Sequence, residues 1–138
     1  MSTHQQEIQI LIGHVICDEL EEYISNKNAC EGLIKFAKEM YGKLDILVCN
    51  AASNPYYGKL AEIPDESFDK IMNNNVKSNL WLCKSAIPHL KDNQKGSSII
   101  IISSIAGLQG VKNLGAYSIS KTCLLYTSDA ADEEDSVD

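Results

Sequence analysis

The sequence predicts an α/β fold, part of a doubly wound parallel β-sheet. Two apolar runs, LDILV at 44–48 and SIIII at 98–102, are too short for helices and are typical of buried strands. A long amphipathic helix is predicted between them, and another helix is expected to begin near Gly115. A strand, helix, strand order needs a crossover connection, which predicts parallel strands with helices on both faces of the sheet.

The helices are predicted from the spacing of their apolar residues. Intervals of three and four from Ala29 to Tyr41 predict a first helix, which Gly42 ends. A second helix is predicted from Asp65 to Leu90, with Asp65 near its N-cap. Residues 103–114 are rich in small side chains and are expected to form a loop. The predicted apolar face of the long helix consists of Phe68, Ile71, Met72, Val76, Leu80, Cys83, Ala86 and Ile87.

Composition and charge exclude several classes of protein. The 138 residues have the length of one domain, and no apolar run approaches the ~18 residues that span a bilayer. Six of the acidic residues behind the net charge of -7 lie in the last ten positions, so the rest is nearly neutral. Without a basic stripe, we expect neither nucleic-acid nor membrane binding, and a soluble cytoplasmic protein. The acidic residues at the end are Asp129, Asp132, Glu133, Glu134, Asp135 and Asp138.

The five cysteines are widely spaced and include no C-x-x-C pair. They therefore predict neither a zinc site nor a disulfide framework, and no metal is expected. Free cysteines are often buried, so we expect small core side chains in a reducing compartment.

Three polar residues follow the predicted strands, at the edge where parallel sheets bind ligands. Ser104 is placed to donate a hydrogen bond to a substrate carbonyl, although Ser103 and Ser104 also fit a turn or a helix cap. Asn50 follows the first strand, where it also fits a turn residue that satisfies backbone groups.

Two helices carry the remaining candidates. Tyr117 and Lys121 are four residues apart, so their side chains share one helix face. A tyrosine is a poor acid or base at neutral pH, and a nearby ammonium stabilises its phenolate, although the pair also fits an ordinary solvated helix. Asn75 falls on an apolar face, where its amide needs buried partners and fits a structural tie to a strand backbone equally well. Asn73 and Asn74 are expected to face solvent or bend the helix.

Together these residues resemble the short-chain dehydrogenase/reductase family over residues 42–121. CNAA at 49–52 stands where the family has N-N-A-G, and NNV at 74–76 matches the family's helix asparagine. IISSIAG and YSISK match its serine strand and Y-x-x-x-K helix. Within the family, the chain is most similar to carbonyl reductases of the dehydrogenase/reductase member-four type. The resemblance implies a Rossmann-like fold and interconversion of a carbonyl and a secondary alcohol by hydride transfer with NADP(H) or NAD(H).

The resemblance also implies a role for each matched residue. Tyr117 is expected to be the general acid/base, and Lys121 to stabilise its phenolate and to hydrogen-bond the nicotinamide ribose. Ser104 would orient the carbonyl, Asn75 would hold a proton-relay water near Lys121, and Asn50–Ala51 would pack along the cofactor. Ala52 replaces the motif's glycine, a change of small cost where the backbone needs no positive φ.

The resemblance covers the central part of the family's domain, residues 29–122. Residues 1–28 are divergent and contain no T-G-x-x-x-G-x-G turn, so the first strand and the pyrophosphate cradle are expected to be missing. The last strands are also expected to be missing, because residues 123–138 turn acidic where the family continues with an apolar helix. The string CLLYTSDAAD resembles a translated sequencing adapter, so we expect residues 123–138 to be non-native.

We therefore expect this chain to be inactive or nearly so. The full-length parent is expected to be a homo-oligomer that acts on a small carbonyl or alcohol, in the cytoplasm or in peroxisomes. One alternative is a catalytically silent binding or dimerisation module, because the long helix and the Tyr/Lys helix form subunit interfaces in this family. An unrelated doubly wound nucleotide or flavin binder is a further alternative, because a fold alone does not fix function.

Overall fold

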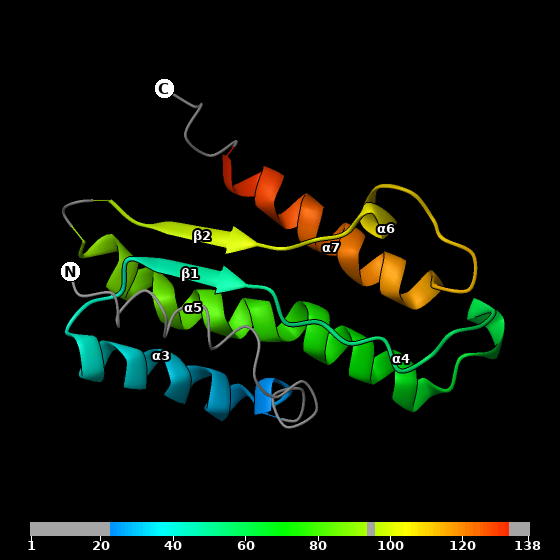
Figure 1. The fold of residues 1–138 in the computed structure, drawn as a ribbon, viewed down its shortest axis with the longest axis horizontal. Helices are drawn as coiled ribbons and strands as arrows, with labels where there is room; N and C mark the ends of the chain where they lie inside the picture. The colour runs from blue at the N-terminus through cyan, green and yellow to red at the C-terminus, as the bar shows by residue number, and fades with distance from the viewer. Residues whose placement is uncertain (1–22, 94–95, 133–138) are drawn as a thin grey trace, which may run out of the picture.

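The structure is a computed structural model that describes residues 23–93 and 96–132. Two parallel strands are combined with helices that run alongside them (Figure 1). The elements are α3 (Lys27–Tyr41), β1 (Ile46–Cys49), η1 (Leu60–Glu62), α4 (Asp65–Met72), η2 (Asn73–Lys77), α5 (Ser78–Lys91), β2 (Ser98–Ile101), α6 (Ile105–Leu108) and α7 (Gly115–Asp132). The predicted segment 1–28 lies mostly outside the described residues.

The two strands pair in parallel, as the sequence predicts. Ile46 lies beside Ser98, and Cys49 lies beside Ile101 at the carboxyl ends. The crossover between them is the continuous helical run of α4, η2 and α5. This confirms a partial α/β fold with a parallel sheet.

Helix α3 has well-defined ends. The Asn26 side chain accepts hydrogen bonds from the backbone N–H groups of Asn28 and Ala29 at 2.9 and 3.3 Å, which satisfies donors at the start of the helix. Gly42 ends the helix with a φ of 73°, a conformation that glycine adopts without strain. Between these ends α3 packs against α5 and the sheet. The buried core consists of Ile24, Cys30, Ile34, Leu47, Cys49, Leu82, Ala86 and Leu90.

The prediction that both strands are buried and that helices cover both faces of the sheet is wrong for the described residues. Side chains alternate between the two faces of a strand, and Leu47 and Cys49 point into the core. On the opposite face Ile46, Val48 and Ile100 are 48%, 55% and 45% exposed. Within residues 23–93 and 96–132, no element covers this open face of the sheet.

The long helix has the predicted extent and part of the predicted face. Most of the predicted residues are buried or half-buried, among them Ile71 and Ala86, but Leu80 and Ile87 are exposed. Leu82 and Leu90, which lie outside the predicted face, are buried. The cause lies in η2, a π-helical turn that holds an extra residue and rotates the face of the helix that follows. Asparagines occupy the buried side at this turn, so the apolar pattern alone does not identify the inner face.

Residues 103–114 form more than a loop. They include the short helix α6, whose N-cap is Ser104. Asn113, with a φ of 65°, accepts a hydrogen bond from the Gly58 N–H at 3.0 Å through its carbonyl oxygen. This contact joins the segment before α7 to the loop after β1.

Candidate active site

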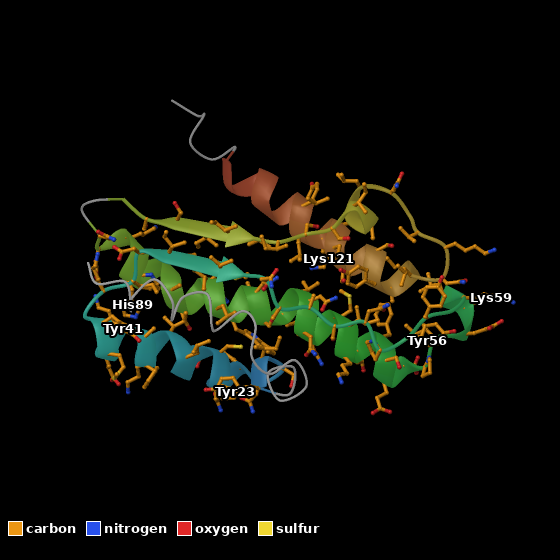
Figure 2. All side chains as sticks on the ribbon, viewed as in Figure 1. Tyr23, Tyr41, Tyr56, Lys59, His89 and Lys121 are labelled. Atoms are coloured by element: carbon orange, nitrogen blue, oxygen red, sulfur yellow. The ribbon has the colours of Figure 1, made fainter. Side chains whose placement is uncertain are left out.

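The candidate site lies at the carboxyl ends of β1 and β2. The loop after β1, the turn η2, helix α6 and the start of α7 meet there. Figure 2 places Lys121 beyond the arrowheads of both strands, whereas His89 and Tyr41 lie at the other end of the molecule. In parallel sheets this edge is the usual place for a ligand.

Asn75 joins three of these segments. Its Oδ1 accepts a hydrogen bond from the Ser53 backbone N–H at 2.8 Å, and its Nδ2 donates to the Ser53 carbonyl oxygen at 3.0 Å. The same Nδ2 donates to Ser120 Oγ at 3.0 Å, and the Asn75 side chain is fully buried. The Asn75 side chain thus ties η2 to the loop after β1 and to α7. This is the structural role that the sequence analysis gave as one of two possibilities.

Asn74 is also buried, so the expectation that it faces solvent is wrong. Its Nδ2 donates to Ser53 Oγ at 3.0 Å, and its carbonyl oxygen accepts from Ser78 Oγ at 2.6 Å. Buried polar groups are tolerated where they find such partners. Within the described residues, Asn74 Oδ1 and Ser118 Oγ have no hydrogen-bond partner.

Ser53 and Ser120 are site residues that the sequence reasoning missed. Ser120 is fully buried, accepts from Asn75, and donates its own hydroxyl to the Tyr117 carbonyl oxygen at 2.7 Å. Ser53 has both backbone groups and its hydroxyl engaged by Asn74 and Asn75. A serine next to the lysine in YSISK was the available signal for Ser120; for Ser53 there was no comparable signal.

Lys121 is almost completely buried, with 2% of its surface exposed. Its Nζ donates to the Ile102 carbonyl oxygen at 3.0 Å and lies 5.7 Å from the centre of the Tyr117 ring. Burial lowers the pKa of Lys121, because the charged form loses water. The alternative of an ordinary solvated helix is therefore wrong for this lysine.

The two serines after β2 have different roles. Ser103 Oγ donates to the Lys121 carbonyl oxygen at 2.8 Å, which attaches the end of the strand to α7. Ser104 Oγ accepts from the Ala106 N–H at 3.2 Å and caps α6, the second role that the sequence allowed. A capping hydroxyl uses only a lone pair, so its O–H can still donate to a ligand oxygen.

Gly107 brings α6 into direct backbone contact with α7. Its carbonyl oxygen accepts from Thr122 Oγ1 at 2.8 Å, and a Cβ at position 107 would lie 2.8 Å from the Lys121 carbonyl carbon. We expect Gly107→Ala to lower the free energy of unfolding by about 1–3 kcal/mol, because the two helices must separate. Urea unfolding followed by circular dichroism measures this change.

Gly32→Ala is the matched control for that prediction. Gly32 lies inside α3 with open space where a Cβ would stand, so alanine there is expected to add up to about 1 kcal/mol of stability. Equal effects of the two substitutions would show that α6 and α7 are not in close contact.

The candidate cofactor residues after β1 lie at the open edge of the site. Asn50 is exposed and Ala51 is half-buried. Among the described non-glycine residues only Asn113 has a positive φ, so Ala52 adopts a backbone conformation that suits alanine.

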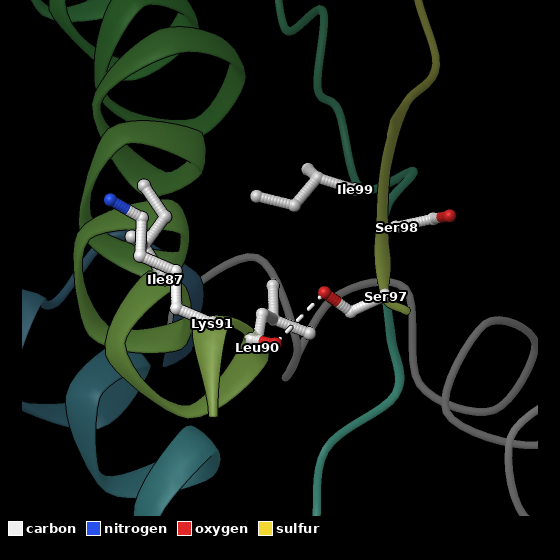
Figure 3. A pocket seen from close by; sticks show the side chains of 6 residues that line it. All are labelled: Ile87, Leu90, Lys91, Ser97, Ser98 and Ile99. Carbon is white, nitrogen blue, oxygen red and sulfur yellow. Dashed lines mark hydrogen bonds between the residues drawn. The ribbon is translucent and has the colours of Figure 1, made fainter. Parts of the chain in front are cut away.

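A shallow hollow at the other end of the sheet is separate from this site (Figure 3). It lies where β2 begins, and Ser97 Oγ donates there to the Leu90 carbonyl oxygen at 3.0 Å. The lining residues are Ile87, Leu90, Lys91, Ser97, Ser98 and Ile99.

Residues 23–93 and 96–132 contain no group of three or more histidine, cysteine or acidic side chains placed to hold a metal ion. In the same ranges, no helix is both long and apolar enough to cross a bilayer. Cys30 and Cys49 are buried, whereas the expectation that the cysteines are buried core residues is wrong for Cys83 and Cys123, which are half-buried.

A parallel α/β sheet with a serine, a tyrosine and a buried lysine at its carboxyl edge defines a protein of the Rossmann-like class. The sequence profile of the family described as short chain dehydrogenase matches residues 12–136, and the chain belongs to this family. This confirms the predicted resemblance and overturns the alternative of an unrelated nucleotide or flavin binder.

Named relatives agree with this assignment. Tropinone reductase-like 3 from Erythroxylum coca is 40% identical over 129 residues, which cover 94% of this chain and 46% of the relative. Dehydrogenase/reductase SDR family member 4 from Bos taurus is 42% identical over 95 residues, which cover 69% of this chain and 34% of the relative. The predicted similarity to the member-four type is thereby confirmed.

Solved structures show the same fold. The NADH-dependent reductase A1-R' complexed with NAD gives a TM-score of 0.75 at 30% identity, over 80% of this chain and 48% of that one. A short chain dehydrogenase from Shigella flexneri complexed with NADP gives 0.71 at 25% identity, over 79% and 45%. The chain therefore spans less than half the length of these relatives.

Proposed function

We propose that the full-length protein containing this chain is an NAD(P)-dependent oxidoreductase that interconverts a carbonyl and a secondary alcohol. The observation that carries this proposal is the buried Lys121 Nζ, 5.7 Å from the Tyr117 ring at the carboxyl edge of a parallel sheet. Tyr117 brings a hydroxyl to this edge of the sheet, and a positioned hydroxyl can give a proton to a reacting carbonyl oxygen or take one from an alcohol. When bound, the nicotinamide supplies or accepts the hydride.

The other residues serve position and proton movement in this proposal. The Ser104 hydroxyl donates to the carbonyl oxygen while it caps α6, and Asn50–Ala51 lie along the cofactor. Lys121 also hydrogen-bonds the nicotinamide ribose. The Asn75 carbonyl oxygen accepts from Asn79 Nδ2 at 2.9 Å and has a second lone pair for a relay water.

The residues present fit the nicotinamide end of such a cofactor. Asn50 is exposed, Ser104 and Tyr117 are half-buried, and the capping geometry leaves the Ser104 O–H available to a ligand. NADP(H) is our first choice of cofactor and NAD(H) the alternative, since solved relatives hold NAD in one case and NADP in another.

A direct assay tests the proposal. The full-length protein and the 138-residue chain are each incubated with NADPH or NADH and a panel of aldehydes and ketones, and nucleotide oxidation is followed by absorbance. We expect carbonyl-dependent turnover by the full-length protein and little or none by the shorter chain. A full-length protein that folds and binds nucleotide but turns over no carbonyl would contradict the proposal.

A catalytically silent dimerisation module is the second candidate. Leu80 and Ile87 on α5 and Ile119 on α7 are 52%, 38% and 40% exposed, so both of these helices carry apolar side chains that a partner subunit could cover. Sedimentation equilibrium of the 138-residue chain mixed with the full-length protein measures this association. Mixed dimers without turnover by either chain would favour this second function.

A further inference from the structure

Ser120 is a buried residue for which the proposed chemistry has no use. It lies on α7 between Tyr117 and Lys121, one helical turn after the tyrosine and directly before the lysine. None of its surface is exposed. A buried hydroxyl is tolerated where its hydrogen bonds are made, so the partners of Ser120 indicate what it does.

Both sides of the Ser120 hydroxyl are occupied. Its Oγ donates to the Tyr117 carbonyl oxygen at 2.7 Å and accepts from Asn75 Nδ2 at 3.0 Å. A hydroxyl has one hydrogen, so the bond to Tyr117 leaves only a lone pair for Asn75. The donors therefore point in one direction, from Asn75 through Ser120 to the backbone of Tyr117.

The backbone of Ser53 fixes the orientation of the Asn75 amide. Asn75 Oδ1 accepts from the Ser53 N–H at 2.8 Å, and Asn75 Nδ2 donates to the Ser53 carbonyl oxygen at 3.0 Å. A reversed amide would place donor against donor and acceptor against acceptor, so the second Nδ2 hydrogen is directed at Ser120. Ser120 is thereby connected to the loop that carries Asn50–Ala51.

We propose that Ser120 is a positioning residue for hydride transfer. It holds the first turn of α7, and with it the Tyr117 side chain, at a set place against the loop after β1. Being fully buried, Ser120 acts through Tyr117 and Asn75 and contacts neither substrate nor cofactor. This inference rests on the proposed function, because the distance that it sets lies between the tyrosine and the nicotinamide.

The bond from Ser120 to Asn75 distinguishes this serine from an ordinary helical serine. A serine hydroxyl that donates to a carbonyl oxygen of the preceding turn is common in helices and has no further consequence by itself. Asn75 lies 45 residues earlier and belongs to another element. Ser118, on the same helix, is also buried, but its Oγ has no hydrogen-bond partner among the described residues. Ser118 is therefore a matched control.

Hydrogen exchange in the 138-residue chain tests the hydrogen bonds without any activity. The Asn75 side-chain amide is observed by proton–nitrogen NMR, and its exchange with solvent is measured. Ser120→Ala is expected to speed this exchange roughly fivefold, the factor that one net hydrogen bond supplies. Ser118→Ala is expected to leave the rate unchanged. Equal rates for the wild type and Ser120→Ala overturn the proposal.

Single-turnover kinetics of the full-length protein test the effect on hydride transfer. Protein saturated with the reduced nucleotide is mixed with the best carbonyl substrate, and nucleotide absorbance is followed in a stopped-flow instrument. The amplitude gives the fraction of molecules that react, and the rate constant gives the speed of the step. For Ser120→Ala we expect a rate constant about 10-fold lower at unchanged amplitude and nucleotide affinity, because misplaced groups react slowly. A merely structural role would lower the amplitude and leave the rate constant unchanged.

Two further variants make the kinetic result specific. Ser120→Thr keeps the hydroxyl, so the molecules that fold are expected to react with a rate constant close to that of the wild type. Ser118→Ala is expected to match the wild type in both quantities. The proposal is overturned if Ser120→Ala keeps the wild-type rate constant, or if Ser120→Thr or Ser118→Ala is as slow as Ser120→Ala. A wild type without carbonyl turnover contradicts the proposed function as well, even where hydrogen exchange has confirmed the hydrogen bonds.

Discussion

Replacing Tyr117 with phenylalanine in the full-length protein is expected to lower kcat by ~10²–10⁴-fold, the usual contribution of a general acid or base. The hydroxyl is the only group removed, and the hydrogen bond from Ser120 Oγ to the backbone carbonyl of residue 117 is kept. Nucleotide affinity is therefore expected to change little. Steady-state kinetics with the best carbonyl substrate, together with a nucleotide titration, measure the two quantities separately.

Tyr41→Phe is the control for that substitution. Tyr41 ends α3 at the far end of the molecule and is 43% exposed, so the loss of its hydroxyl is expected to leave kcat unchanged. Similar kcat values for the wild type and Tyr117→Phe would remove Tyr117 from the proposed chemistry, even if the enzyme is active.

Replacing Asn75 with alanine is expected to lower the free energy of unfolding by about 3 kcal/mol, because three buried hydrogen bonds are lost and their partners remain buried. The groups that lose a partner are the N–H and carbonyl of Ser53 and the acceptor side of the Ser120 hydroxyl, which still donates to the Tyr117 carbonyl oxygen. Urea unfolding of the 138-residue chain, followed by circular dichroism, gives the value without any activity.

Asn73→Ala is the matched control, since Asn73 is half-buried and opens the same π-helical turn. Its effect is expected to stay within about 0.5 kcal/mol, as at most surface positions. If Asn73→Ala and Asn75→Ala destabilise the chain equally, the hydrogen bonds from Asn75 are not the source of the stability.

The sequence predicts the elements well because local patterns decide them. The helix predicted over 29–41 is found at Lys27–Tyr41, and the run predicted at 98–102 is the strand Ser98–Ile101. Short apolar runs and a glycine after a helix act within a few residues of their own position. Such signals need no knowledge of the tertiary structure.

The inner face of the long helix was not predictable in the same way. Asn74 and Asn75 are polar, yet they are the most buried residues of η2, because Ser53 and Ser120 satisfy them from distant segments. Apolar Leu80 is exposed on the continuation of the same helix. Partners that lie 22 and 45 residues away along the chain leave no periodic signal in the helix itself.

The residues of the candidate site were predicted from the sequence, but their surroundings were not. Motif spacing identified Tyr117 and Lys121, but the burial of Lys121 and its bond to the Ile102 carbonyl oxygen depend on how β2 and α7 pack. The sequence offered a helix cap as one of the possible roles of Ser104, and in the structure Ser104 caps α6.

The open face of the sheet also bears on aggregation. Ile46, Val48, Ile100 and Ile102 present hydrocarbon to water across two neighbouring strands. Uncovered apolar surface of this kind is an aggregation liability, because a second apolar surface that covers it removes hydrocarbon from water. Among the described residues, these four side chains are therefore the place where we expect copies of the chain to associate.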